Sequence, residues 1–282
     1  MSIEDLRIKS NGATMNGLTQ VPTSVTLSAE QFERLYLNPM MHRRQPDLTK
    51  KFGNPTPLGL GAFVLTATPI ACCLMGWRGA TGVGAAFSGV LVLFGGVFLV
   101  FAGVMEFILG NTFSGAVFCH LGAFCLALGA TLTPAFNAAA PYSADGTNTL
   151  QGLHSPEFLT TFAFFFVFMA LLMFIYIICA LRTNVVFVLI FTGLFLYFCL
   201  FAASWWHLAA GNLVVGNRCQ VGSGAALFAA SMLGFYLLAA QLFSSVGLPI
   251  TLPVGDLTEL WSRGTSRREA SDLEVGEESG SK

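Results

Sequence analysis

The sequence predicts an all-α integral membrane protein with six transmembrane helices, and three observations carry this prediction. Hydrophobic residues make up 54% of the 282 residues and charged residues only 10%, whereas soluble domains carry about 25% charged residues. Six apolar stretches are each long enough to cross a bilayer as a helix, which takes roughly 20 residues. Of the 14 basic and 15 acidic residues, only six lie between residues 53 and 246. This composition excludes an ordinary soluble domain.

Each predicted helix is bounded by polar or turn-forming residues. Residues 76–79 separate the first two helices, residues 110–112 separate the second from the third, and residues 182–184 form a three-residue turn before the fifth. The Gly-Asn pairs within residues 211–217 predict a loop before the sixth helix, because both residue types tolerate left-handed φ angles. The predicted helices cover approximately residues 57–75, 80–106, 114–133, 157–181, 185–207 and 221–246.

The distribution of Lys and Arg residues predicts the orientation. If both tails are inside, the inner segments hold twelve Lys and Arg residues, and the outer segments hold only Arg78 and Arg218. Cytoplasmic segments carry the excess of positive charge, so the chain is expected to place both termini in the cytoplasm. This gives a largely disordered N-terminal tail at residues 1–53, a membrane domain at residues 54–256 and a disordered C-terminal tail at residues 257–282.

Several functional classes are excluded by composition and motif content. A formal net charge of −1 gives no case for nucleic-acid binding, which needs a concentrated basic surface. The sequence has no phosphate-binding loop, no dinucleotide fingerprint and no catalytic constellation, so no enzyme activity and no cofactor are predicted. Six of the seven cysteines fall in apolar stretches and none has metal-ligand spacing, so no metal site is predicted.

Glycines recur every seven residues in the second and third predicted helices. The second carries Gly82, Gly89, Gly96, Gly103 and Gly110, and the third carries Gly115, Gly122 and Gly129. Seven residues are close to two helical turns, so each set is expected to form a slowly drifting stripe on one face. Close helix packing at small residues is the favoured interpretation, and lining of a narrow permeation path is the alternative.

The fourth predicted helix has the opposite character. It contains no glycine, and seven phenylalanines occur between residues 158 and 174. Side chains of this size suit a surface that faces lipid or another subunit. We do not expect this helix to line a polar path.

Two prolines mark the start of the first helix, in the segment Asn54-Pro55-Thr56-Pro57-Leu58-Gly59. They fix the backbone and remove two hydrogen-bond donors. A rigid helix start is the simpler interpretation and is favoured by the spacing alone. The alternative is that unpaired backbone groups line a solute site, a known use of irregular backbone at membrane depth.

Apart from Glu157, the first residue of the fourth predicted span, Glu106 is the only acidic residue inside a predicted span, and ionisable residues within membranes are costly and commonly functional. It lies near the inner end of its helix. It is expected either to support the solute path or to hold Asn111 and Thr112 in the following turn.

Three motifs, in order, resemble those of the acetate uptake transporter family, the succinate–acetate permeases of bacteria and their fungal relatives. Residues 54–60 match the NPxPLGL signature, Glu106-Phe107 followed by Gly110-Asn111-Thr112-Phe113 resembles the element ending in GNTF, and residues 252–256 resemble a C-terminal LPVGD element. The resemblance extends over the whole membrane domain. The turn at residues 182–186 and the long tails resemble the fungal branch.

The resemblance implies a ring-like homohexamer in which each subunit has its own path for acetate. It also implies a hydrophobic constriction, which aligns here with Phe63, Leu121 and Leu194. The family places a tyrosine where this chain has Leu121. A leucine offers no hydrogen-bond donor and is smaller, so this substitution predicts a wider, drier constriction that favours the neutral acid and accepts propionate.

The resulting hypothesis is a plasma-membrane carrier or channel for acetate and related short carboxylates, linked to protons. Its partners are expected to be the small carboxylate, protons, membrane lipid and further copies of itself. Ammonium export is one alternative. A nutrient sensor that transports nothing is another, for which the charged tails are the only support in the sequence.

Overall fold

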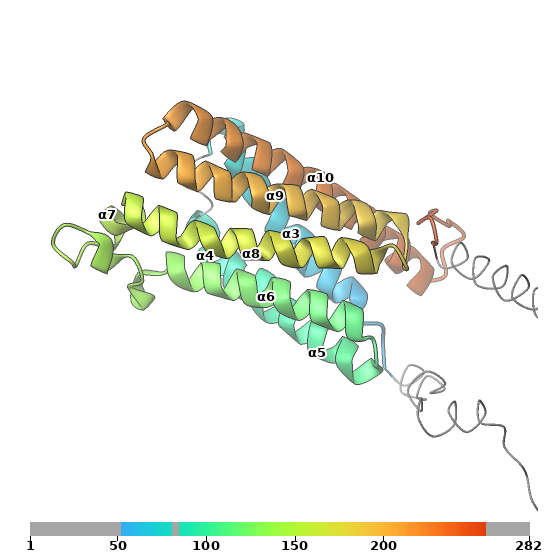
Figure 1. The fold of residues 1–282 in the computed structure, drawn as a ribbon. Helices are drawn as coiled ribbons and strands as arrows, with labels where there is room; N and C mark the ends of the chain where they lie inside the picture. The colour runs from blue at the N-terminus through green and yellow to red at the C-terminus, as the bar shows by residue number, and fades with distance from the viewer. Residues whose placement is uncertain (1–51, 81–84, 258–282) are drawn as a thin grey trace, which may run out of the picture. The chain divides into compact units, whose positions relative to one another are not determined.

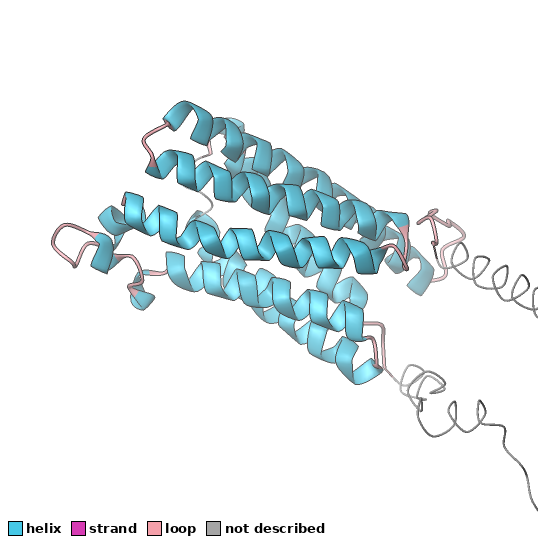
Figure 2. Ribbon diagram, viewed as in Figure 1, coloured by secondary structure: helices cyan, strands magenta, loops and turns pink. Residues whose placement is uncertain are grey.

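The structure, a computed structural model, describes residues 52–80 and 85–257, so the predictions for both tails lie outside the described residues. Within these ranges, the chain forms six helices long and apolar enough to cross a membrane, and Figure 2 shows helix throughout with no strand drawn. The prediction of an all-α membrane fold is therefore confirmed. The spans are α3 (Thr56–Leu74), Ser88–Leu109, α6 (Thr112–Leu132), α8 (Pro156–Ala180), α9 (Val185–Ala209) and α10 (Leu213–Ser245).

The six spans pack side by side around a common centre (Figure 1). The second span packs on α3 and α6, α10 packs on α3 and α9, and α8 packs on α9. Ring contacts between Phe124 and both Phe165 and Phe166 join α6 to α8. Phe124 also contacts Phe198 of α9, with 5.0 Å between ring centroids.

The second span is not a continuous α-helix. It consists of α4 (Ser88–Val90), a π-helix η5 (Leu91–Phe98) and α5 (Leu99–Leu109). It begins at Ser88 rather than at the predicted residue 80, after a short 3₁₀ turn. Because a π-helix has more residues per turn, it breaks the seven-residue register that the glycine pattern assumed.

Gly82 lies outside the described residues, and the rest of the glycine stripe of the second span is shorter than predicted. Gly96 and Gly103 pack against α6, but Gly89 has open space where a side chain would extend. Gly110 ends α5 with a φ of +88°, which makes it a helix cap and not a packing residue. On α6, a side chain at Gly115 or Gly122 would meet backbone oxygens of Gly103 and Gly96, each at 3.1 Å. These glycines mediate helix packing, the favoured interpretation.

The sixth span begins at Leu213, eight residues before its predicted start. Asn212 caps it by accepting a hydrogen bond from the Val215 amide at 3.3 Å. Gly216 was expected to form a turn, but it lies inside α10 and packs against Leu208 of α9. Polar residues can also form a helix where they face water. The first apolar residue therefore does not mark the first residue of α10.

The C-terminal LPVGD segment returns to the turn between α8 and α9. The Val185 amide donates to the Gly255 carbonyl at 2.9 Å, and the Leu257 amide donates to the Thr183 carbonyl at 3.0 Å. The Tyr236 hydroxyl of α10 donates to the Pro253 carbonyl at 2.7 Å. This motif therefore closes the end of the bundle where α9 begins.

Candidate functional site

A buried carboxyl group organises one end of the bundle. Glu106 of α5 is fully buried. One of its carboxyl oxygens, Oε2, accepts a hydrogen bond from the Asn111 amide group at 2.6 Å, and Oε1 accepts from the Thr56 hydroxyl. The carboxyl group thus joins the end of α5 to the starts of α6 and α3. Its role in holding Asn111 was predicted, whereas its contact with Thr56, fifty residues earlier, was not.

The proline-rich segment starts α3 with its backbone largely hydrogen-bonded. Asn54 Oδ1 accepts from the Thr56 amide at 3.0 Å and lies 2.8 Å from the Thr56 hydroxyl. The Pro55 carbonyl accepts from the amides of Leu58 and Gly59, at 3.0 and 3.2 Å. Pro57 lies in the first turn of the helix, where its missing N–H is tolerated. This geometry favours the rigid-helix-start interpretation.

Three of the predicted site residues stand apart from this polar cluster. Leu58 is exposed. Gly59 packs against the Phe118 ring, which would lie 2.7 Å from an added Cβ atom. Thr112 is exposed at the start of α6, and its hydroxyl donates no hydrogen bond within the described residues. The contacts of Gly59 thus point to packing between α3 and α6.

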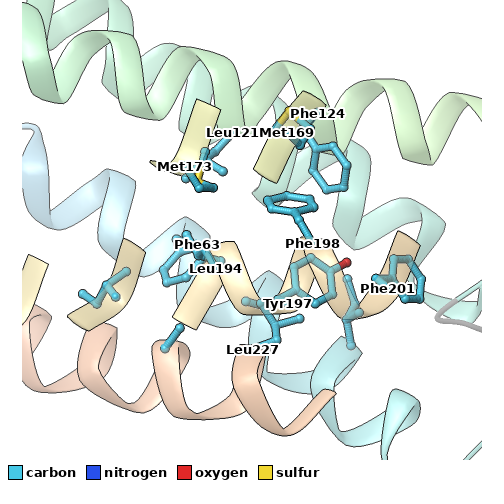
Figure 3. Close-up of a cluster of buried hydrophobic side chains, with 14 of the residues drawn as sticks. Phe63, Leu121, Phe124, Met169, Met173, Leu194, Tyr197, Phe198, Phe201 and Leu227 are labelled. Carbon is cyan, nitrogen blue, oxygen red and sulfur yellow. The ribbon is translucent and has the colours of Figure 1, made fainter. Parts of the chain in front are cut away.

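A cavity lies at the centre of the bundle, and all three predicted constriction residues line it. Phe63 comes from α3, Leu121 from α6 and Leu194 from α9, and each is buried, with at most 8% of its surface exposed. Figure 3 shows Leu121 across from Phe63 and Leu194. The cavity volume is about 50 Å³. None of the residues of the polar cluster lines it.

The walls of the cavity are almost entirely apolar. Leu91, the first residue of the π-helix, and Leu99, the first residue after it, both line the cavity. No charged side chain is among the lining residues. No residue of α8 lines it either, as the phenylalanine content of that helix predicted. The polar side chains in the wall are Thr66, Cys125 and Tyr197.

Tyr197 was missed by the sequence analysis, although a signal was present. It lies three residues after Leu194 on α9, and residues three apart share a helix face. Applying this period to Leu194 would have placed Tyr197 in the same wall.

Residues 36–259 match the GPR1/FUN34/yaaH family. The chain belongs to this family. Among its GPR1/FUN34/yaaH relatives, "Protein alcS" of Aspergillus fumigatus is 59% identical over 249 residues, covering 88% of this chain and 91% of that protein. "Acetate permease A" of Emericella nidulans is 30% identical over 265 residues, covering 88% and 83%.

The bacterial acetate channel SatP has a similar structure. The TM-score is 0.57 at 22% sequence identity, and the match covers 72% of this chain and 99% of the channel. At this identity, the likeness shows the shared fold. Together with the six apolar spans, membership of the GPR1/FUN34/yaaH family identifies the chain as a multi-pass membrane transport protein and not an enzyme.

Proposed function

We propose that this protein carries acetate and related short-chain monocarboxylic acids across the plasma membrane. The observation that carries the proposal is the central cavity, where Phe63, Leu121 and Leu194 converge from three helices. The names of two relatives, "Acetate permease A" and "Acetate transporter protein patA", support the choice of substrate.

The apolar wall favours the neutral acid over its anion. Stripping water from a carboxylate without supplying charge or donors is costly, and hydrophobic constrictions exclude hydrated ions. The lining residues include no charged side chain that could compensate an anion. An acid that crosses in neutral form takes its own proton with it, so proton linkage requires no separate proton path.

The assembly and orientation are part of the same proposal. Phe164, Phe168 and Phe174 of α8 are each about half exposed or more, which suits contact with lipid or with neighbouring copies in a homohexamer. Six spans return the chain to the side on which it started. The excess of Lys and Arg in the tails then favours cytoplasmic termini.

Uptake of labelled acetate and labelled methylammonium by cells that lack other carriers for them tests the proposal. We expect acetate uptake that falls as external pH rises through the pKa of the acid, with propionate also accepted. Uptake of methylammonium without acetate would favour ammonium transport instead. Uptake of neither by correctly localised protein would favour the sensor hypothesis.

A further inference from the structure

The Tyr197 side chain lines the cavity, and no described residue pairs with its hydroxyl. Only 4% of the residue surface is exposed. Within the described residues, no donor or acceptor pairs with its hydroxyl oxygen, although its ring stacks on Phe201 with 5.4 Å between centroids. Figure 3 shows the ring held between Leu194 and Phe201. The ring is therefore fixed while its polar group is unsatisfied.

The Tyr197 hydroxyl is free to bind a group that enters the cavity. Hydroxyl groups inside folded proteins usually have a hydrogen-bond partner, and among the described residues this hydroxyl has none. The other polar groups of the wall are less suited to binding, because the Thr66 hydroxyl donates to the Ala62 carbonyl at 2.9 Å and the Cys125 thiol is only a weak donor. Among the polar groups of this wall, the Tyr197 hydroxyl is therefore the one strong donor and acceptor that no described residue pairs with.

We infer that the Tyr197 hydroxyl binds the carboxyl group of a neutral short-chain monocarboxylic acid inside the cavity. This inference rests on the proposed function and names the residue that recognises the substrate. A hydroxyl is both a donor and an acceptor, and an undissociated carboxylic acid presents one group of each kind. The apolar tail of the acid then contacts the apolar side chains that line the cavity. A dicarboxylic acid would bury its second carboxyl group against apolar walls, so it is bound poorly.

The position of Tyr197 bears on the substitution at residue 121. The sequence predicted a constriction without a donor, because Leu121 replaces the tyrosine of the resembling family. Tyr197 of α9 lines the same cavity as Leu121 and carries a hydroxyl, whose oxygen lies on the side of the ring that faces Phe201 (Figure 3). The donor has therefore not been lost from the cavity but stands on a different helix.

Three variants of the full-length protein test this inference through the half-saturating concentration for labelled acetate. Tyr197→Phe removes only the hydroxyl, and we expect that concentration to rise about fivefold, the value of one neutral hydrogen bond. Adding Leu121→Tyr to this variant returns a hydroxyl to the cavity and should restore the wild-type value. Tyr176→Phe is the control, since Tyr176 is also a buried residue, but it does not line the cavity and its hydroxyl pairs with His120 Nδ1 at 2.8 Å.

Thermal stability measurements distinguish a loss of acetate binding from a general loss of folded structure in Tyr197→Phe. Because the Tyr197 hydroxyl is unpaired, Tyr197→Phe should be at least as thermostable as the wild type without acetate, and acetate should stabilise it less. If the wild type transports acetate and Tyr197→Phe keeps its half-saturating concentration, the inference is overturned while the proposed function stands. If the wild type transports no acid, the proposed function fails and this inference fails with it. Rescue by Leu121→Tyr supports the inference, since a purely structural role could not be restored from another helix.

Discussion

The pairs α5–α6 and α8–α9 achieve close packing by opposite means. Between α5 and α6, glycines bring the two backbones together, so that a side chain at Gly103 would meet the Cys119 amide nitrogen at 2.8 Å and the Gly115 carbonyl at 2.9 Å. Between α8 and α9, aromatic rings fill the space, with Phe166 at 4.7 Å from Phe201 and 5.1 Å from Trp205 by ring centroids.

The difference explains where the cavity lies. The glycines leave the α5–α6 contact without bulk, and the large side chains of α6, including Leu121 and Phe124, lie in the cavity wall. The phenylalanines of α8 fill the contact with α9. Helix α8 therefore packs behind α9 and contributes no residue to the cavity wall. Small residues therefore set the distance between helices, and large ones set the free space within the bundle.

The largest loss of stability is expected on removing an aromatic ring from the contact between α8 and α9. Phe166 is fully buried, and Phe166→Ala removes a ring from a cluster that cannot easily collapse, at a cost of about 3–5 kcal/mol. Phe168→Ala is the control, because Phe168 is 65% exposed on the same helix, and it should cost less than about 1 kcal/mol. Thermal unfolding of the purified protein in detergent measures both. Equal losses would show that the buried ring is not what holds α8 to α9.

The glycine pair is tested by adding a single methyl group. Gly103→Ala forces the backbones of α5 and α6 apart and should cost about 1–3 kcal/mol. Gly89→Ala is matched in chemistry and in the seven-residue pattern, but nothing lies within 4 Å of the added atom, so it should be neutral or slightly stabilising. The fraction of protein recovered as a folded species after detergent extraction reports the difference. A destabilised Gly89→Ala would mean that the predicted stripe does extend through the π-helix.

A loss of stability no larger than that of Gly103→Ala is expected where the α5–α6 pair ends in the buried polar cluster. In Glu106→Gln, the side-chain carbonyl can accept from Asn111 while the amide group donates to the Thr56 hydroxyl, so both contacts persist. Glu106→Ala leaves the Asn111 amide group unpaired, although the Thr56 hydroxyl can still donate to Asn54 Oδ1, and it should cost about 1–3 kcal/mol. Surface expression and acetate uptake should therefore fall much further for alanine than for glutamine. Wild-type behaviour of both variants would rule out a supporting role for this carboxyl group.

The sequence contained enough information for the fold but not for its irregularities. The bilayer demands long apolar helices, so composition alone located all six spans. Hydropathy does not distinguish α from π hydrogen bonding, so the π-helix at Leu91–Phe98 was not predicted and Gly89 was wrongly placed on the packed face. Hydropathy also measures how far the apolar sequence extends, which differs from how far the helix extends. The start of α10 was therefore predicted too late.

The candidate site was predicted in part, for a related reason. Phe63, Leu121 and Leu194 were found because a resemblance supplied their alignment, and the structure places them around one cavity. The pairing of Thr56 with Glu106 depends on how α3 docks against α5, which no local pattern records. The unpaired hydroxyl of Tyr197 is likewise a property of three-dimensional packing.

The docking of the LPVGD segment has a consequence for the design of chimeric proteins. Its backbone hydrogen bonds tie Gly255 and Leu257 to the turn that precedes α9, and α9 carries Leu194 and Tyr197. A fusion joined directly after Ser245, the last residue of α10, would replace these bonds with foreign sequence. An exchange of C-terminal tails between relatives should therefore be joined after Leu257, so that the start of α9 keeps its hydrogen bonds to this segment.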